Sequence, residues 1–176
     1  MIRFSLIFFL IVASAPLARA DGNDGQTLRS ADGEYQLKVP RGWEAEDFHL
    51  DAVAIGAIDK HLGEYAEVVA ENVDDYTSSL TLYAEAKRDV MAMSLDNPRM
   101  SPGRDVTVNG AHALRFEIHG ELPNSSVSIG YVLTVLKTKT HYIQIIGWLK
   151  DSHFKEHAAD LQALAEGFSE SADSQK

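Results

Sequence analysis

Three apolar stretches joined by short turns fill the second half of the chain and constrain its fold more than any other feature. The first, 111–119, alternates apolar with polar residues and follows Asn109-Gly110, a pair that a two-residue type I′ hairpin turn favours. The second and third, 127–137 and 141–148, are separated by a Lys/Thr turn. Because short turns of this kind join antiparallel strands, this half of the chain predicts an antiparallel sheet.

Further strands and two helices are expected around this sheet. Short strand patterns cover residues 27–30, 34–40, 51–58, 65–71 and 105–108. Apolar residues recur at helical spacing over 80–95 and 152–167. Segregated strands and helices indicate an α+β fold rather than wound βαβ units. Strands that are apolar on both sides indicate a sheet covered on both faces, so we expect an α/β/α sandwich around a largely antiparallel sheet of about six strands.

The first predicted helix carries a single apolar stripe. A Thr/Ser run at 77–79 supplies its N-cap, and Asn97-Pro98 ends it. The residues of the stripe follow one another at spacings typical of one helix face: Tyr83, Ala86, Val90 and Met93. We expect this stripe to pack against the sheet.

The N-terminal segment 1–20 has the pattern of an export signal. Arg3 supplies a positive charge, residues 4–13 are apolar, and Ala18-Arg19-Ala20 offers the small residues that a signal peptidase reads. The apolar run is shorter than the roughly 20 residues that a membrane span needs. We therefore expect cleavage after Ala20 and a soluble, periplasmic or secreted protein. The mature chain 21–176 is expected to form a single domain with its core at 27–168.

Composition excludes several classes of partner and site. Loss of the leader reduces Lys and Arg from 16 to 14 against 26 Asp and Glu, which leaves a net charge of −12. Such a chain is repelled by phosphate backbones, so nucleic acid is not an expected partner. The chain has no Cys, which excludes zinc–thiolate sites and thiol nucleophiles.

One motif has the composition of a catalytic site. His153, Glu156 and His157 form H-x-x-E-H, in which two histidines of an inverted metallopeptidase hold zinc and the glutamate acts as base. On the predicted helix, Phe154 belongs to the buried face, Glu156 points to solvent, and His157 lies at the edge of that face. Such an enzyme also needs a third protein ligand and a cleft, and the helix supplies neither. His153 and His157, with Asp160, therefore remain weak candidates for a metal site, with no catalytic residue assigned and no cofactor expected.

Two tryptophans follow predicted strands. Trp43 and Trp148 have apolar neighbours, so we expect both to lie buried at strand ends. The alternative is an exposed aromatic patch that contacts a partner.

Several of these segments together resemble the PsbP-like superfamily. The motif 37-LKVPRGW-43 resembles the opening strand of that superfamily, and 52-AVAIGAI-58 resembles the strand that follows. The stretch EYAEVVAENV, the hairpin from Asn109 to Arg115, the Gly147-Trp148 strand end and Phe168 come in the same order. The resemblance covers residues 27–168, nearly the whole mature chain.

This resemblance implies an antiparallel sheet between helices and a role in binding rather than catalysis. The superfamily includes PsbP, Mog-type Ran-binding factors and bacterial exported DcrB-like domains. It carries no functional residues over to this chain, because Pro40, Gly42 and Trp43 match positions that are structural.

Together, these features predict an exported, soluble, non-enzymatic binding or accessory protein with a protein partner of unknown identity. One alternative is a metal-dependent hydrolase that uses His153, Glu156 and His157. Another is a small-molecule carrier with a cleft between sheet and helix.

Overall fold

A computed structural model describes residues 25–48 and 52–171 of the chain. The predicted leader and its cleavage site after Ala20 lie outside the described residues. The elements are, in order, β1 (Gln26–Arg29), β2 (Tyr35–Val39), β3 (Glu44–Ala45), β4 (Val53–Asp59), β5 (Glu64–Asn72), a 3₁₀ turn η1 (Val73–Asp75), α1 (Leu80–Met93), β6 (Asp96–Met100), β7 (Arg104–Val108), β8 (Ala111–Glu121), β9 (Ser128–Lys137), β10 (His141–Lys150), α2 (Asp151–Glu166) and β11 (Phe168–Glu170). Neither described helix is long and apolar enough to cross a membrane.

The larger sheet has the order β3-β4-β5-β10-β9-β8-β6, and β7 also pairs with β8. All of its neighbouring strands are antiparallel. Asn109 and Gly110 join β7 to β8 with φ angles of 46° and 83°, as the predicted hairpin requires. The α+β class and the antiparallel sheet are confirmed, but this sheet has eight strands, more than the six or so expected.

The strand β6 was missed because its sequence, DNPRM, contains the Asn-Pro pair that also ends a helix. β6 lies at the end of the sheet order, where one side of the strand has no ladder. Pro98 is tolerated at such an edge because the hydrogen-bond donor it lacks is not needed there.

A second sheet contains three strands in the order β1-β2-β11. Phe168, which directly follows the predicted helix 152–167, begins β11 and pairs with Leu37 of β2. Gly167 makes this pairing possible, since a Cβ atom there would lie 2.3 Å from the carbonyl oxygen of Lys38.

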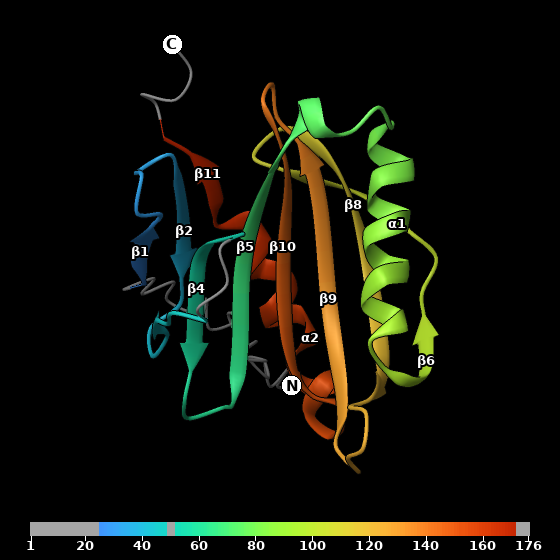
Figure 1. Cartoon of the computed structure of the whole chain (residues 1–176). Coiled ribbons are helices and arrows are strands. Elements are labelled where there is room, and N and C mark those ends of the chain that lie inside the picture. Colours follow the sequence, from blue (N-terminus) through green and yellow to red (C-terminus); the bar gives the residue numbers. More distant parts are fainter. Residues whose placement is uncertain (1–24, 49–51, 172–176) are drawn as a thin grey trace, which may run out of the picture.

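One face of the larger sheet is covered by α2 and by the three-stranded sheet (Figure 1). α2 packs on β9 and β10, directly against the backbone. A Cβ atom at Gly130 would lie 2.2 Å from the Phe154 ring, and one at Gly147 would lie 3.1 Å from Leu161. These two glycines therefore set how closely α2 approaches the sheet.

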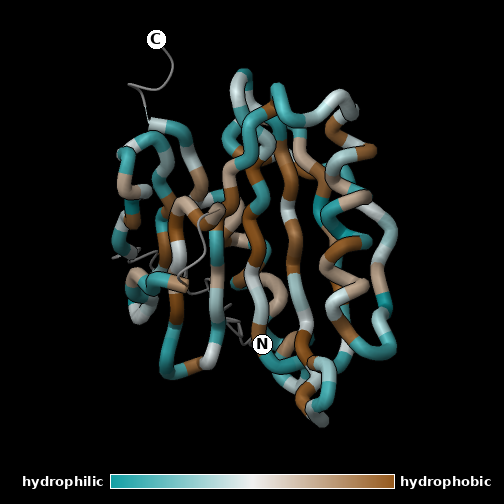
Figure 2. The backbone as a smooth tube through the Cα atoms, in the orientation of Figure 1, coloured by the Kyte–Doolittle hydropathy of each residue, from teal (hydrophilic) through white to brown (hydrophobic). Residues whose placement is uncertain are grey.

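The opposite face is covered only in part. α1 begins at its N-cap Ser79, whose hydroxyl accepts a hydrogen bond from the Leu82 backbone, and packs on β8, β9 and β6. Figure 1 shows α1 on the β8 side of the sheet, with β4 and β5 free of any helix on this face. Hydrophobic residues continue along β5 and β10, beyond the region that α1 covers (Figure 2).

The predicted apolar stripe of α1 is wrong beyond its first residue. Tyr83 is buried as expected, but Ala86 is exposed, and Val90 and Met93 are 63% and 84% exposed. The helix is rotated because Lys87 turns toward the sheet, where its Nζ donates a hydrogen bond to Glu71 at 2.8 Å. A polar contact with β5 therefore overrides the simple apolar period.

Candidate functional site

The H-x-x-E-H motif occupies the first two turns of α2 and is split among three environments. His153 is exposed, and the Glu156 side chain is 79% exposed. Phe154 is buried, and His157 is half-buried at the edge of the face that α2 turns to the sheet. The expected orientation of the helix is confirmed, and the two histidines do not converge on one group.

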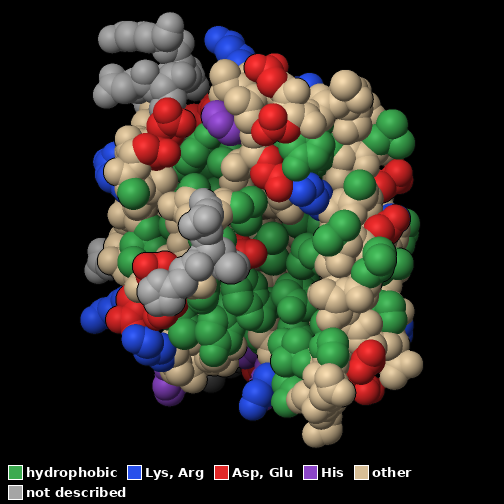
Figure 3. Space-filling view, in the orientation of Figure 1, with side chains coloured by type: hydrophobic (Ala, Val, Ile, Leu, Met, Phe, Trp, Pro, Cys, Tyr) green, Lys and Arg blue, Asp and Glu red, His purple; other side chains and the backbone are tan. Residues whose placement is uncertain are grey.

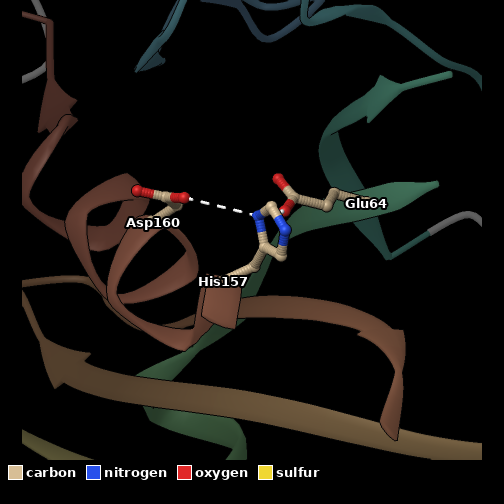
Figure 4. A group of neighbouring side chains, drawn as sticks. All are labelled: Glu64, His157 and Asp160. Atoms are coloured by element: carbon tan, nitrogen blue, oxygen red, sulfur yellow. Dashed lines mark ion pairs between the residues drawn. The ribbon is translucent and has the colours of Figure 1, made fainter. Parts of the chain in front are cut away.

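His157 lies between two carboxylates (Figure 4). Its Nδ1 atom is 2.9 Å from Glu64 Oε1 and 3.6 Å from Asp160 Oδ2. Asp160 is one turn further along α2, whereas Glu64 is the first residue of β5. Within the described part of the chain, these three residues form a group whose possible ligand atoms all lie within 4.8 Å of one another.

Glu64 is the member of this group that the sequence reasoning missed. It was assigned to the turn 59–64, but it begins β5, and its side chain is only 1% exposed. Alternation of Glu64 with Ala66 and Val68 would have placed it on the face that α2 covers. Burial raises the pKa of Glu64, and the neighbouring His157 partly offsets this effect.

The contact between Glu64 and His157 lacks the alignment of a hydrogen bond. Glu64 Oε1 and His157 Nδ1 are both buried with no hydrogen-bond partner among the described residues. One imidazole nitrogen and two carboxylate oxygens are donors that divalent transition metals accept. The predicted hydrolase arrangement is not formed, since Glu156 faces solvent and His153 lies outside the group.

A second candidate site is the part of the larger sheet that α1 leaves uncovered. Tyr65 of β5, Trp148 of β10 and Tyr131 of β9 are cross-strand neighbours in one row. Trp148 stacks on Tyr65 with ring centroids 5.3 Å apart and lies 6.1 Å from the Tyr131 ring. All three are half-buried, and Figure 3 shows hydrophobic side chains gathered over the middle of this face. We call Tyr65, Glu67, Tyr131 and Trp148 the open sheet face.

The two tryptophans have different environments. Trp43 is 4% exposed, which confirms its expected burial. Trp148 is only half-buried and stacks on Tyr65, so its expected burial is met in part. The sequence could not predict this difference in burial between Trp43 and Trp148, because it depends on how much of the sheet α1 covers.

Glu67 lies within this aromatic surface, with no counter-charge from the described part of the chain. It lies two residues along β5 from Tyr65, opposite Ile146 of β10, and is half-buried. Burial raises the pKa of Glu67, and no hydrogen bond or ion pair to another described residue offsets it. Burial and the charge of Glu67 both raise the pKa of Tyr131.

Glu71 lies on the same side of β5 as Glu67, but its carboxylate is fully hydrogen-bonded. It accepts hydrogen bonds from Tyr76 and Lys87, each at 2.8 Å, and from Tyr83. Burial alone would raise the pKa of Glu71, but these three donors outweigh it and lower the pKa. Donors from α1 and from Tyr76 therefore satisfy Glu71, whereas no hydrogen bond from a described residue reaches Glu67.

A cleft of about 430 Å³ lies between β6, β8 and the start of α2. His119 Nδ1 is 2.5 Å from Asp151 Oδ1 within it, and Arg99 is 3.6 Å from the same carboxylate. Carrier pockets are mostly apolar with few polar groups. The lining of this cleft combines these charged groups with the apolar side chains of Met100 and Phe154.

No protein-family model and no curated protein matches the chain, but several solved structures do. The cyanobacterial PsbP (CyanoP) of Synechocystis sp. PCC 6803 superposes with a TM-score of 0.59 at 14% identity, covering 89% of this chain and 100% of that one. LpqN of Mycobacterium tuberculosis, involved in cell envelope biogenesis, gives 0.58 at 11%, covering 84% and 90%. The Ran-binding protein Mog1p of Saccharomyces cerevisiae gives 0.55 at 10%, covering 83% and 95%.

These likenesses show that the chain has the PsbP-like fold, as its motifs predicted. With identities of 10% to 14%, the likeness is one of fold alone.

Proposed function

We propose that the chain is an exported, non-enzymatic binding or accessory protein that takes a protein partner on the open sheet face. The observation that carries the proposal is Glu67, a half-buried carboxylate with no hydrogen bond or ion pair from another described residue, set beside stacked aromatic rings. A carboxylate withheld from water costs free energy unless a partner satisfies it. A surface of this kind is better explained by an occupant than by the isolated fold.

The chemistry of the face selects a partner with a cationic side chain flanked by apolar ones. An arginine fits best, because its planar guanidinium pairs with a carboxylate and also stacks on aromatic rings. Tyrosine, tryptophan and arginine are the residues that most often dominate protein interfaces. The acidic composition of the whole chain would also attract a basic partner.

Three further observations support the proposal. The segment 1–20 has the features of an export signal. Mog1p, which shares the fold, is a Ran-binding protein, so a protein partner is compatible with this architecture. A non-enzymatic role is favoured by the separation of His153, Glu156 and His157 into different environments.

Site-specific photo-crosslinking in the native cell tests the proposal. A photoreactive residue is placed at Tyr131, in the open sheet face, or at Lys155, which is exposed on the far side of the sheet on α2. The Tyr131 position is then combined with Glu67→Lys, or with Glu156→Lys as a matched charge reversal on α2. We expect a reproducible adduct from Tyr131 that Glu67→Lys abolishes and Glu156→Lys preserves.

The proposal fails if Tyr131 gives no adduct, or if Tyr131 and Lys155 give the same adducts. It also fails if Glu67→Lys leaves the Tyr131 adduct unchanged. Far-UV circular dichroism of each variant separates a lost interface from a lost fold.

A further inference from the structure

We propose that Glu64, His157 and Asp160 form a binding site for one Zn²⁺ ion, independent of the open sheet face. The site joins the start of β5 to the second turn of α2. It lies on the opposite side of the sheet from Glu67, because Glu64 and Glu67 have opposite parity along β5. It therefore makes no use of the surface assigned to the protein partner.

The distances are those at which ligands of one metal ion lie from one another. Ligands bound to zinc at about 2.0–2.2 Å in tetrahedral geometry lie roughly 3.3 Å from one another. The separations from His157 Nδ1, 2.9 Å to Glu64 and 3.6 Å to Asp160, bracket this value. Both carboxylates thus approach the same imidazole nitrogen, and an ion held among the three groups could contact all of them.

Burial supplies the second, independent argument. Glu64 Oε1 and His157 Nδ1 are buried, close together and without hydrogen-bond partners among the described residues. Buried polar atoms are normally satisfied, and a bound cation would satisfy both at once. The contrast is Glu71, whose carboxylate receives three aligned donors.

The three ligands indicate which metal ion would bind, and their exposure indicates how it would reach the site. Imidazole with two carboxylates suits Zn²⁺, whereas Ca²⁺ takes six to eight oxygen ligands. Asp160 is 64% exposed, so the third ligand lies at the mouth of the site and a fourth position faces water. His153 is exposed and outside the group, which makes it a matched control on the same helix.

Calorimetric titration of the metal-stripped full chain with Zn²⁺ tests the site. We expect one ion per chain, with proton release and a raised thermal midpoint. Loss of a group that only hydrogen-bonds to a metal ligand already costs about 10- to 100-fold in affinity, so loss of a ligand in His157→Ala or Glu64→Gln should weaken binding by roughly 100-fold or more. Asp160→Asn, at an exposed position that tolerates substitution, should weaken it by about tenfold or more, and His153→Ala should leave it unchanged.

Absence of stoichiometric Zn²⁺ binding would overturn the proposal and leave Glu64 and His157 as a buried ion pair. Equal affinity in the wild type and Asp160→Asn, or loss of binding in His153→Ala, would also overturn it. Ca²⁺ or Mg²⁺ binding with the same affinity would exclude the transition-metal assignment. Asp160→Asn keeps the test decisive even if a change at Glu64 or His157 prevents folding.

Discussion

Three glutamates of β5 are withdrawn from water, and two of them have a counterpart among the described residues. Glu64 faces His157 on the α2 side, Glu71 is held by donors from the α1 side, and Glu67 has neither. A strand that carries acids at these positions costs stability unless each charge is matched. Substitutions at these three glutamates can therefore separate effects on folding from effects on function.

Glu71→Gln should destabilise the fold, with a definite pH dependence. The pKa of Glu71 is lower in the folded state than in the unfolded state, so its contribution is present above the unfolded value of about 4.3 and is lost as the pH falls through the folded value. Loss of charge-assisted hydrogen bonds should lower the free energy of unfolding by about 1–3 kcal/mol at pH 7. Urea unfolding at pH 7, 5 and 3 measures whether this difference shrinks in acid; Glu85→Gln, at an exposed position of α1, is the control.

A difference between the wild type and Glu71→Gln that stays constant from pH 7 to pH 3 would contradict this account. It would mean that the shape of the side chain, rather than its charge, holds α1 to β5.

Glu67→Gln should have the opposite effect on stability. The pKa of Glu67 is raised in the folded state, so above about pH 4.3 the unfolded chain loses its proton first and the charge destabilises the fold. The neutral variant should have a thermal midpoint about 1–3 °C higher at pH 7, with the gain vanishing below about pH 4. A lower midpoint at pH 7 would show that Glu67 stabilises the isolated fold, and the case for an external partner would weaken.

The elements differ in how far the sequence predicts them. The hairpin at Asn109-Gly110 and the helix α2 were predicted because turn residues and a helical apolar period are local signals. β6 and β11 were not, since a short edge strand exists through pairing with a distant strand. For the candidate sites, strand parity could have placed Glu64 and Glu67 on opposite faces of the sheet. It could not have predicted the contact of Glu64 with His157, because that contact depends on how α2 crosses the sheet.

That crossing depends on small residues in the strands beneath α2. Gly130→Ala would place a methyl group within 2.2 Å of the Phe154 ring, so α2 must move or the ring must leave its rotamer. Overpacking of this kind should lower the free energy of unfolding by about 1–3 kcal/mol. Chemical denaturation of Gly130→Ala, Phe154→Leu and the double variant measures the coupling, and the double variant should recover part of the loss. Strictly additive losses would show that Phe154 is not the residue that Gly130 accommodates.

At the scale of the whole molecule, the larger sheet separates two hydrophobic clusters. One lies under α2 and the three-stranded sheet and contains Trp43. The other lies under α1, and Trp148 packs against its margin. Both clusters draw on β5, β9 and β10, so unfolding of these strands removes the packing of both clusters together.

The two tryptophans therefore report on opposite sides of one cooperative unit. In Trp148→Phe the fluorescence comes from Trp43 in the first cluster, and in Trp43→Phe it comes from Trp148 at the second. Each variant has its own stability, so fluorescence and far-UV circular dichroism are compared within the same variant during urea unfolding. We expect the two signals to share one midpoint in both variants, as a two-state transition requires. An earlier fluorescence transition in Trp148→Phe alone would show that the three-stranded sheet detaches before the larger sheet unfolds.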